Sequence, residues 1–283
     1  MEVITSIKEI QQLSRLIEKE GKKIGFVPTM GFLHEGHLSL VDLIRARSDV
    51  LILSIFVNPT QFGVGEDLEN YPRDMERDFE LCRGRKVDYV FAPKTGNIYQ
   101  ANASSYVSEE EVSLGLCGQA RPNHFKGVTT ICAKLFNLCR PTYVALGQKD
   151  AQQVVVLKRM IRDLHFPVEV VIGPTLRESD GLALSSRNSY LNERQRRDAL
   201  LLSKALIAGK HLVDDKKIRN VDRVKAELMT ILRTGSLIRV NYVEVVDRET
   251  MDLEKEIQIG RSMLVIAAWV DNIRLIDNIL LNE

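Results

Sequence analysis

The chain has 283 residues, of which 45% are hydrophobic, and its 39 basic and 38 acidic residues leave a formal net charge of +1. This length allows one large domain or two ordinary ones, and the apolar content supports a packed core and excludes disorder. The near-zero net charge argues against general binding to nucleic acid or to an anionic membrane. We therefore expect any anion to be bound by a local cluster of residues.

The sequence shows no targeting signal and no disulfide framework. Residues 1–10 include acidic residues and lack the uninterrupted apolar run of a secretory signal. The longest apolar runs, 50–57 and 263–270, are too short to span a bilayer. The cysteines form no C-x-x-C pair, so we expect reduced and mostly buried thiols in a soluble, cytoplasmic protein. They are Cys82, Cys117, Cys132 and Cys139.

The first predicted elements are a helix, a strand and a second helix. Residues 6–20 have apolar positions at helical spacing, and Gly21 follows as a typical helix end. The apolar run 23–27 indicates a buried strand, and the periodicity of 38–47 indicates a helix. Residues 28–37, P-T-M-G-F-L-H-E-G-H, connect them.

This connection, which we call the histidine turn, contains His34 and His37 where the strand passes into the helix. The backbone N–H groups of a first helical turn are unpaired and the helix dipole is positive there, so a phosphate is favoured. Imidazole N–H groups would add donors, and Gly31 and Gly36 would let a ligand approach the backbone closely. The turn therefore predicts a phosphate-binding site.

Three other interpretations of the histidine turn stay open. Its His-Glu-Gly-His spacing is one residue short of the H-E-x-x-H zinc motif, and no nearby Cys or His offers a third ligand. The histidines could instead form an ordinary helix cap. The third interpretation is that a different loop of the chain binds the phosphate. However, the chain contains neither G-x-x-x-x-G-K-[ST] nor a G-x-G-x-x-G after a strand. A bound nucleotide would therefore have to be held by the histidine turn.

The chain then alternates strands and helices. Expected strands cover 50–57, 88–92, 142–146 and 168–172, and expected helices cover 74–83, 128–138 and 151–164. Residues 58–63 are expected to form a loop because Pro59 removes a ladder donor. Residues 94–126 are rich in glycine and are expected to be mostly loop, with a brief strand near Tyr106. The alternation predicts a doubly wound α/β sheet that binds ligands at the carboxyl ends of its strands.

The pattern changes near Gly173-Pro174, and residues 176–192 are polar and irregular. Helices are expected at 193–213 and 221–233, and strands at 239–246, 263–270 and 273–276. Helices followed by paired strands predict a smaller α+β domain. We place the boundary near residue 176, which divides the chain into domains 1–176 and 177–283.

Polar side chains follow several of the predicted strands. Asn58 and Gln61 follow one strand, Lys149 and Asp150 follow another, and Gln153 comes one helical turn later. Because the carboxyl ends of parallel strands meet at one edge of a sheet, we expect these groups to converge on the histidine turn. Lys149 suits a phosphate, Asp150 suits ribose hydroxyls, and Gln153 suits a polar substrate.

A last polar cluster, L-S-S-R-N, occupies residues 184–188. The hydroxyls of Ser185 and Ser186 and the planar guanidinium of Arg187 suit phosphate oxygens. A helix-capping, serine-rich linker would explain the same residues equally well.

Six segments lie in order through residues 23–191: PTMGFLHEGH (28–37), FVNPTQF (56–62), YPR (71–73), HFKG (124–127), KDAQQ (149–153) and GLALSSRN (181–188). Together they resemble the pantoate–β-alanine ligase family, whereas an H-x-G-H turn alone would indicate only the wider HIGH-type adenylate-forming and nucleotidyl-transferring superfamily. The resemblance implies a Rossmann-like ATP- and pantoate-binding domain, a smaller C-terminal α+β lid domain, and a homodimer.

The implied reaction joins (R)-pantoate to β-alanine with ATP, giving pantothenate, AMP and pyrophosphate through a pantoyl adenylate, as a step of coenzyme A biosynthesis. The resemblance implies ATP and Mg²⁺ as cofactors, and no nucleic-acid or membrane partner. A nucleotidyltransferase that keeps the adenylyl group in its product and a non-catalytic nucleotide sensor are the alternatives.

The resemblance also implies roles for individual residues. His37 would be the proton donor and His34 a phosphate contact, with Lys149, Ser185 and Arg187 as further catalytic groups. The implied ATP contacts are Met30, Gly31, Phe32, Leu33, His34, Glu35, Gly36, His37, Gly147, Gln148, Lys149, Asp150, Leu176, Leu184, Ser185, Ser186 and Arg187.

Pantoate and β-alanine would be bound by Asn58, Gln61 and Gln153, and Mg²⁺ by Asp78 in the helix after Tyr-Pro-Arg. At two positions the chain departs from the commonest pattern of the family. Gln148 replaces a more usual Glu or Pro, and Lys126 stands where Arg is common. Neither change removes a group to which we assign chemistry.

Overall fold

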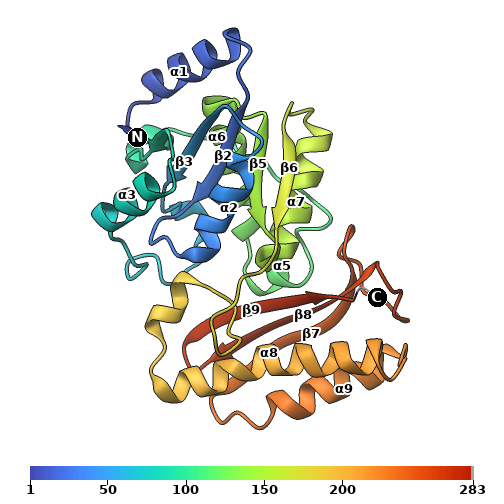
Figure 1. Ribbon diagram of the computed structural model, residues 1–283. Helices are drawn as coiled ribbons and strands as arrows, with labels where there is room; N and C mark the ends of the chain where they lie inside the picture. The colour runs from blue at the N-terminus through green and yellow to red at the C-terminus, as the bar shows by residue number, and fades with distance from the viewer. Residues whose placement is uncertain (282–283) are drawn as a thin grey trace.

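The computed structural model describes residues 1–281, which form two β-sheets, each with its own helices (Figure 1). The first sheet is parallel and has the strand order β1-β4-β3-β2-β5-β6. Its strands are β1 (Glu2–Ile4), β2 (Ile24–Thr29), β3 (Val50–Ile55), β4 (Tyr89–Phe91), β5 (Tyr143–Gly147) and β6 (Glu169–Gly173). The helices of this part are α1 (Ile7–Lys19), α2 (Glu35–Arg45), α3 (Met75–Gly84), α4 (Thr95–Ile98), α5 (Cys117–Ala120), α6 (His124–Cys139) and α7 (Ala151–Asp163).

The second sheet is antiparallel, with the strand order β7-β8-β9. Three short 3₁₀ helices complete the fold: η1 (Pro59–Gln61), η2 (Gln148–Asp150) and η3 (Ser186–Tyr190). The remaining elements are α8 (Glu193–Asp214), α9 (Val221–Leu232), β7 (Ile238–Asp247), β8 (Ser262–Val270) and β9 (Ile273–Leu280). This architecture confirms the predicted doubly wound α/β fold with a smaller α+β part.

Helices cover both faces of the parallel sheet. On one face, α1, α6 and α7 pack over β2 and β5, and the rings of Phe26 and Phe136 meet edge to face with centroids 6.5 Å apart. On the other face, Val41 and Ile44 of α2 pack with Cys82 of α3 in a second core. The central strands are buried on both sides, which is why they appear in the sequence as continuous apolar runs.

The order in which successive strands are added to the sheet reverses between β2 and β5, which are parallel and lie side by side in the middle of the sheet. From β2 the chain proceeds through β3 and β4 toward one edge, whereas β5 and β6 lead to the other. In such sheets ligands bind outside the carboxyl ends of the strands at this reversal. The histidine turn follows β2 and η2 follows β5, so both segments lie at that point.

Several elements differ from the sequence-based predictions. No strand forms near Tyr106, because the backbone of Val107 is bonded by side chains of α6 instead of by another strand. Its N–H donates to Thr130 Oγ1 at 2.9 Å, and its carbonyl accepts from Thr129 Oγ1 at 2.7 Å. Helix α6 begins at His124 instead of residue 128, and α2 begins at Glu35 inside the histidine turn. Strand β1, too short to show a period, was not predicted.

The C-terminal sheet lies between its own helices and the parallel-sheet domain (Figure 1). Helices α8 and α9 pack on one face, and on the other face Val246 and Val265 pack with Phe125 and Val155. Strand β9 continues to Leu280, beyond its predicted end at Ile276. The predicted domain boundary near residue 176 falls between the end of β6 and the first residue of the C-terminal core, and it stays a prediction. No helix within residues 1–281 is long and apolar enough to cross a membrane.

The side chain of Phe26 is fully buried in the strand that leads into the histidine turn. We expect Phe26→Ala to lower the free energy of unfolding by about 3–5 kcal/mol, because it removes a buried ring and leaves a cavity. Leu164→Ala is the control, since Leu164 is 52% exposed and should change stability by less than about 0.5 kcal/mol. Urea unfolding of both variants checks this, and equal small losses would contradict the packing described.

Candidate active site

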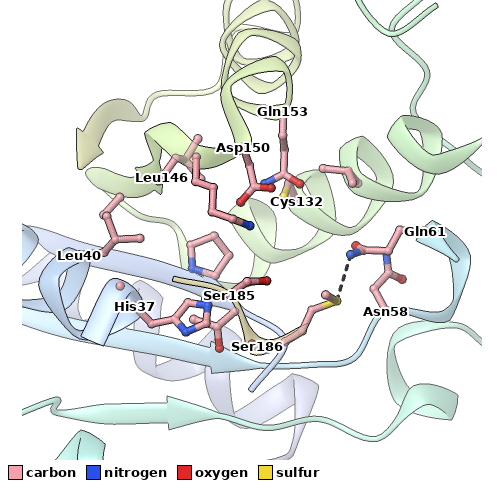
Figure 2. A pocket seen from close by; sticks show the side chains of 18 of the residues that line it. His37, Leu40, Asn58, Gln61, Cys132, Leu146, Asp150, Gln153, Ser185 and Ser186 are labelled. Atoms are coloured by element: carbon pink, nitrogen blue, oxygen red, sulfur yellow. Dashed lines mark hydrogen bonds between the residues drawn. The ribbon is translucent and has the colours of Figure 1, made fainter. Parts of the chain in front are cut away.

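A cavity of about 240 Å³ lies at the carboxyl ends of β2 and β5. Figure 2 shows side chains from separate parts of the chain pointing into it. Most predicted site residues line it: Met30, His34, Gly36, His37, Asn58, Gln61, Gly147, Lys149, Asp150, Gln153, Leu176, Leu184, Ser185, Ser186 and Arg187. Apolar residues of α2 and β5 form one flank, and apolar residues of α6 form the other. Such a cavity suits a ligand with an apolar part and a strongly polar centre.

The other predicted site residues within 1–281 lie outside this lining. Leu33 is buried in the core, and Glu35 forms an ion pair with Arg85 at 2.8 Å. The side chain of Gln148 bonds to Asn278 of β9 instead. Gly31, Phe32 and Asp78 line a different hollow on the far side of the histidine turn.

His34 and His37 cap the start of α2 and also line the cavity. The Gly36 N–H donates to His34 Nδ1 at 3.1 Å, and the His34 N–H donates to His37 Nδ1 at 3.3 Å. A Cβ at Gly36 would lie 2.8 Å from His34 Cε1, so glycine is needed there. Because each Nδ1 accepts a hydrogen bond, the proton of each neutral ring must be on Nε2. The helix-cap interpretation therefore accounts for Nδ1 and leaves Nε2–H as a donor.

Burial determines the charge of these two rings. Burial lowers the pKa of His34 to about 4 and the pKa of His37 well below its ordinary value, and nearby Lys149 lowers both further. Both imidazoles are therefore neutral near pH 7. The positive charge comes instead from Lys149, whose ammonium forms no ion pair within residues 1–281. This wall of the cavity thus combines one available cation with two neutral N–H donors.

Asp78 of α3 holds the histidine turn from behind. Its carboxylate accepts hydrogen bonds from the N–H groups of Phe32 and Leu33, both at 2.7 Å. Phe32 has a φ of 49°, a left-handed conformation that residues other than glycine adopt rarely. Both oxygens of Asp78 are thus engaged in supporting the turn, outside the cavity lining. The magnesium role that the resemblance implied for Asp78 does not fit this position.

Asn58 orients Gln61. Asn58 is 1% exposed, and its Nδ2 donates to Gln61 Oε1 and to the carbonyl of Gly127, both at 3.1 Å. Its Oδ1 accepts from two hydroxyl groups, so its hydrogen-bonding capacity is used within the protein. Gln61 Nε2 therefore points the other way, toward Met30 Sδ at 3.0 Å (Figure 2). The structure thus gives Asn58 a supporting position and leaves Gln61 as a donor to a ligand.

Arg121 and His124 line the cavity but were not among the predicted site residues. Arg121 Nε donates to Glu66 at 2.7 Å, and His124 Nδ1 donates to the carbonyl of Gln61 at 2.8 Å. Burial lowers the pKa of His124 to about 4, so this ring is also neutral. Gly127 allows the close approach, because a Cβ there would lie 2.3 Å from a carbonyl oxygen of η1. The HFKG motif was the available signal, but the sequence did not show that it faces Gln61.

The segment that begins the C-terminal domain closes the cavity. Ser185 Oγ accepts from the N–H of Arg187 at 3.3 Å, and Ser186 Oγ donates to the carbonyl of Phe32 at 3.4 Å. The guanidinium of Arg187 forms two 2.9 Å bonds to Asp67. Asp67 therefore balances the charge of Arg187, while Nη1 makes no hydrogen bond to any residue of 1–281.

The cavity contains no activated nucleophile or metal cluster among residues 1–281. Burial raises the pKa of the Cys132 thiol to about 12, so it stays protonated at neutral pH. All four cysteines are free and buried, which confirms the expectation that they are mostly buried; their reduced state stays a prediction. No group of three His, Cys, Asp or Glu residues in this range is arranged to hold a metal ion. The arrangement therefore suits stabilisation of anionic charge more than covalent catalysis.

Comparisons with known proteins match one family over almost the whole chain. The family model described as Pantoate-beta-alanine ligase matches residues 2–280. Pantothenate synthetase of Thermosipho africanus is 49% identical over 281 residues, which cover 99% of this chain and 100% of the relative. The crystal structure of pantothenate synthetase from Thermus thermophilus has a TM-score of 0.94 at 39% identity, covering 100% of both chains.

A further solved structure carries ligands. It is pantoate–β-alanine ligase from Francisella tularensis, complexed with beta-gamma ATP and β-alanine, and its TM-score is 0.82 at 30% identity over 99% of this chain and 97% of that one. Full-length matches in sequence and in structure lead to one conclusion. The chain belongs to the pantoate–β-alanine ligase family.

Proposed function

We propose that this protein joins (R)-pantoate to β-alanine at the expense of ATP, giving pantothenate, AMP and pyrophosphate. One observation carries the proposal beyond family membership: Lys149 and the Nε2–H groups of His34 and His37 line one cavity at the reversal point of the sheet. This set of donors can stabilise negative charge as it develops on a phosphate. Among residues 1–281, the rest of the cavity supplies binding groups and no activated nucleophile.

The triphosphate of ATP is assigned to the start of α2, where the helix dipole is positive and unpaired N–H groups favour an anion. Lys149, Ser185 and Nη1 of Arg187 supply further donors on the facing walls. Adenine is assigned to the apolar flank of α2 and β5. Pantoate is assigned to the opposite flank, where the amides of Gln61 and Gln153 can bind its carboxylate and hydroxyls.

The proposed reaction has two steps. A carboxylate oxygen of pantoate attacks the α-phosphorus, the bond to the bridging oxygen breaks, and pyrophosphate leaves with the electron pair. The neutral amine of β-alanine then attacks the acyl carbon of pantoyl adenylate, the bond to AMP breaks, and the nitrogen loses a proton. His37 acts in the first step as a neutral Nε2–H donor to phosphate oxygens, which refines the proton-donor role that the resemblance implied.

Water must be kept from pantoyl adenylate, because an acyl phosphate ester hydrolyses readily. The C-terminal domain contributes Ser185, Ser186 and Arg187 to the cavity wall, and Ser186 is bonded to the histidine turn. We infer that this domain acts as a lid which excludes water during the reaction. The homodimer, which the resemblance implies, and the cytoplasmic location, which the cysteine pattern indicates, stay predictions.

Magnesium is proposed to enter with ATP. Within residues 1–281, Asp150 is the only carboxylate that lines the cavity, and it forms no ion pair there. Mg²⁺ prefers octahedral oxygen ligands and commonly keeps water and phosphate oxygens among them. One available carboxylate is consistent with that mode of binding, in which the ion would neutralise phosphate charge.

Adenylation is tested by exchange of labelled pyrophosphate into ATP with Mg²⁺, measured with and without pantoate and without β-alanine. We expect exchange only when pantoate is present, because the first step is reversible. Absence of exchange, together with no AMP release after β-alanine is added, would overturn the proposal. It would favour a nucleotide sensor or a transferase that retains the adenylyl group.

The role of His37 is tested by two substitutions that mimic opposite sides of the ring. His37→Asn keeps an acceptor near Nδ1 and loses the Nε2–H donor, whereas His37→Gln places an amide N–H near Nε2 and loses the cap. We expect His37→Asn to lower kcat by roughly 10²–10⁴. His37→Gln should retain more activity and lose about 0.5–2 kcal/mol of stability. AMP release and thermal unfolding measure both effects, and a normal kcat for His37→Asn would refute the donor role.

The protonation state of the histidine turn predicts a pH dependence. The folded pKa of His34 is lowered from 6.5 to about 4, so the unfolded chain binds a proton in this range that the folded chain excludes. The contribution of neutral His34 to the free energy of unfolding is therefore fully present above about pH 6.5. It is lost as the pH falls toward 4. Side-chain ¹H–¹⁵N NMR should show His34 and His37 as neutral Nε2–H rings at pH 6. Titration of either ring with a midpoint near 6.5 in the unliganded protein would contradict the assignment.

A further inference from the structure

Turn η2 carries Lys149 and Asp150 into the cavity, yet its own domain provides it with no side-chain cap. Gly147 is the N-cap of η2 and Asp150 is the N-cap of α7, and neither position makes a side-chain capping hydrogen bond. The backbone groups of a turn still need partners when they are shielded from water. Side chains from elsewhere in the fold can therefore add to the support that β5 and α7 give η2.

This added support comes from Asn278 on β9, in the C-terminal domain. Its Nδ2 donates to the carbonyl of Gln148 at 3.0 Å and to the carbonyl of Lys149 at 2.9 Å. Its Oδ1 accepts from Nε2 of Gln148 at 3.2 Å. The two N–H groups of the Asn278 side-chain amide therefore donate to the carbonyls of two consecutive residues. Asn278 is only 5% exposed, so water cannot readily replace these bonds.

The neighbouring residue fixes Asn278 in turn. Asp277 Oδ1 accepts from the backbone N–H of Asn278 at 2.8 Å. The carboxylate of Asp277, whose side chain is 3% exposed, also forms a two-bond pair with Arg177 at 2.6 and 3.0 Å. Arg177 follows Leu176, which lines the cavity. One run of contacts therefore joins residues 176–177, β9 and η2.

We propose that Asn278 is a positioning residue for the adenylation step, acting through η2 on the place of Lys149 relative to the histidine turn. Asn278 is absent from the lining of the cavity and lies in an adjoining hollow that shares Lys149 and Asp150 with it. Its amide bonds to η2, so we assign it a positioning role and not a catalytic one. Its two donated hydrogen bonds fix the backbone of η2, which includes Lys149. The proposal rests on the function proposed above, because it assigns Lys149 to the phosphates. It also implies that the ATP site is complete only when Asn278 of the C-terminal domain is in contact with η2.

The test compares Asn278→Asp with Asn278→Ala in full-length protein. Asn278→Asp keeps the shape of the side chain, removes both donors and sets a carboxylate oxygen against two carbonyls. We expect each variant to lower kcat of pantoate-dependent pyrophosphate exchange by roughly 10–100-fold and to raise KM for ATP, because small misplacements of a reacting group have effects of this size. The KM for β-alanine in the complete reaction should change less than about twofold, since η2 is assigned to the phosphates.

Leu228→Ala is the matched control. Leu228 is fully buried in the C-terminal core on α9, and its truncation weakens the same domain without touching η2. At a temperature where all variants are folded by circular dichroism, the control should keep wild-type kcat and KM for ATP. If the Asn278 variants also keep both constants, or if Leu228→Ala loses as much exchange activity at equal loss of Tm, the proposal is overturned. Failure of the wild-type protein to exchange pyrophosphate would instead overturn the function itself.

Discussion

Parallel pairing of β2 with β5 is the contact on which the site depends. Phe26 pairs with Val144 in the middle of the sheet, and the carboxyl ends of the two strands therefore open side by side. This pairing brings the histidine turn and η2, which are more than a hundred residues apart in the chain, to the same cavity. Burial by α6 on one face and α2 on the other makes this central pair rigid, and loops at its end inherit a fixed relative position.

The electrostatics of the cavity follow from which charges already have partners. Arg121 is paired with Glu66 and Arg187 with Asp67, whereas burial keeps His34 and His37 neutral. Within the described chain, most of the available positive charge is therefore concentrated at Lys149. A site built in this way need not place several unpaired cations together before ATP arrives, which would cost stability through mutual repulsion. Neutral N–H donors can still stabilise negative charge that develops on a phosphate.

The two domains share the site through polar contacts. Ser186 is bonded to the carbonyl of Phe32 in the histidine turn, and Asn278 is bonded to the carbonyls of η2. Each contact joins the C-terminal domain to one of the two turns that the β2–β5 pair presents. Polar contacts of this kind are compatible with domain movement, because their groups can be solvated when they separate. The C-terminal domain therefore completes the wall of the cavity through contacts that can separate.

The alternation of elements, the histidine turn and the convergence of polar segments after the strands could be predicted from the sequence, because burial of one face of an element imposes a regular spacing of apolar residues. The sequence also supported the family resemblance, since the motifs lie in order along the chain. The hydrogen-bond partners of the polar groups could be identified only from the folded structure. Asp78 supports a turn, Asn58 orients Gln61, Val107 bonds to threonines of α6, and β9 extends through Asp277 and Asn278. Polar residues carry no periodic signal, and the distant donors and acceptors that satisfy them become known only when the chain has folded.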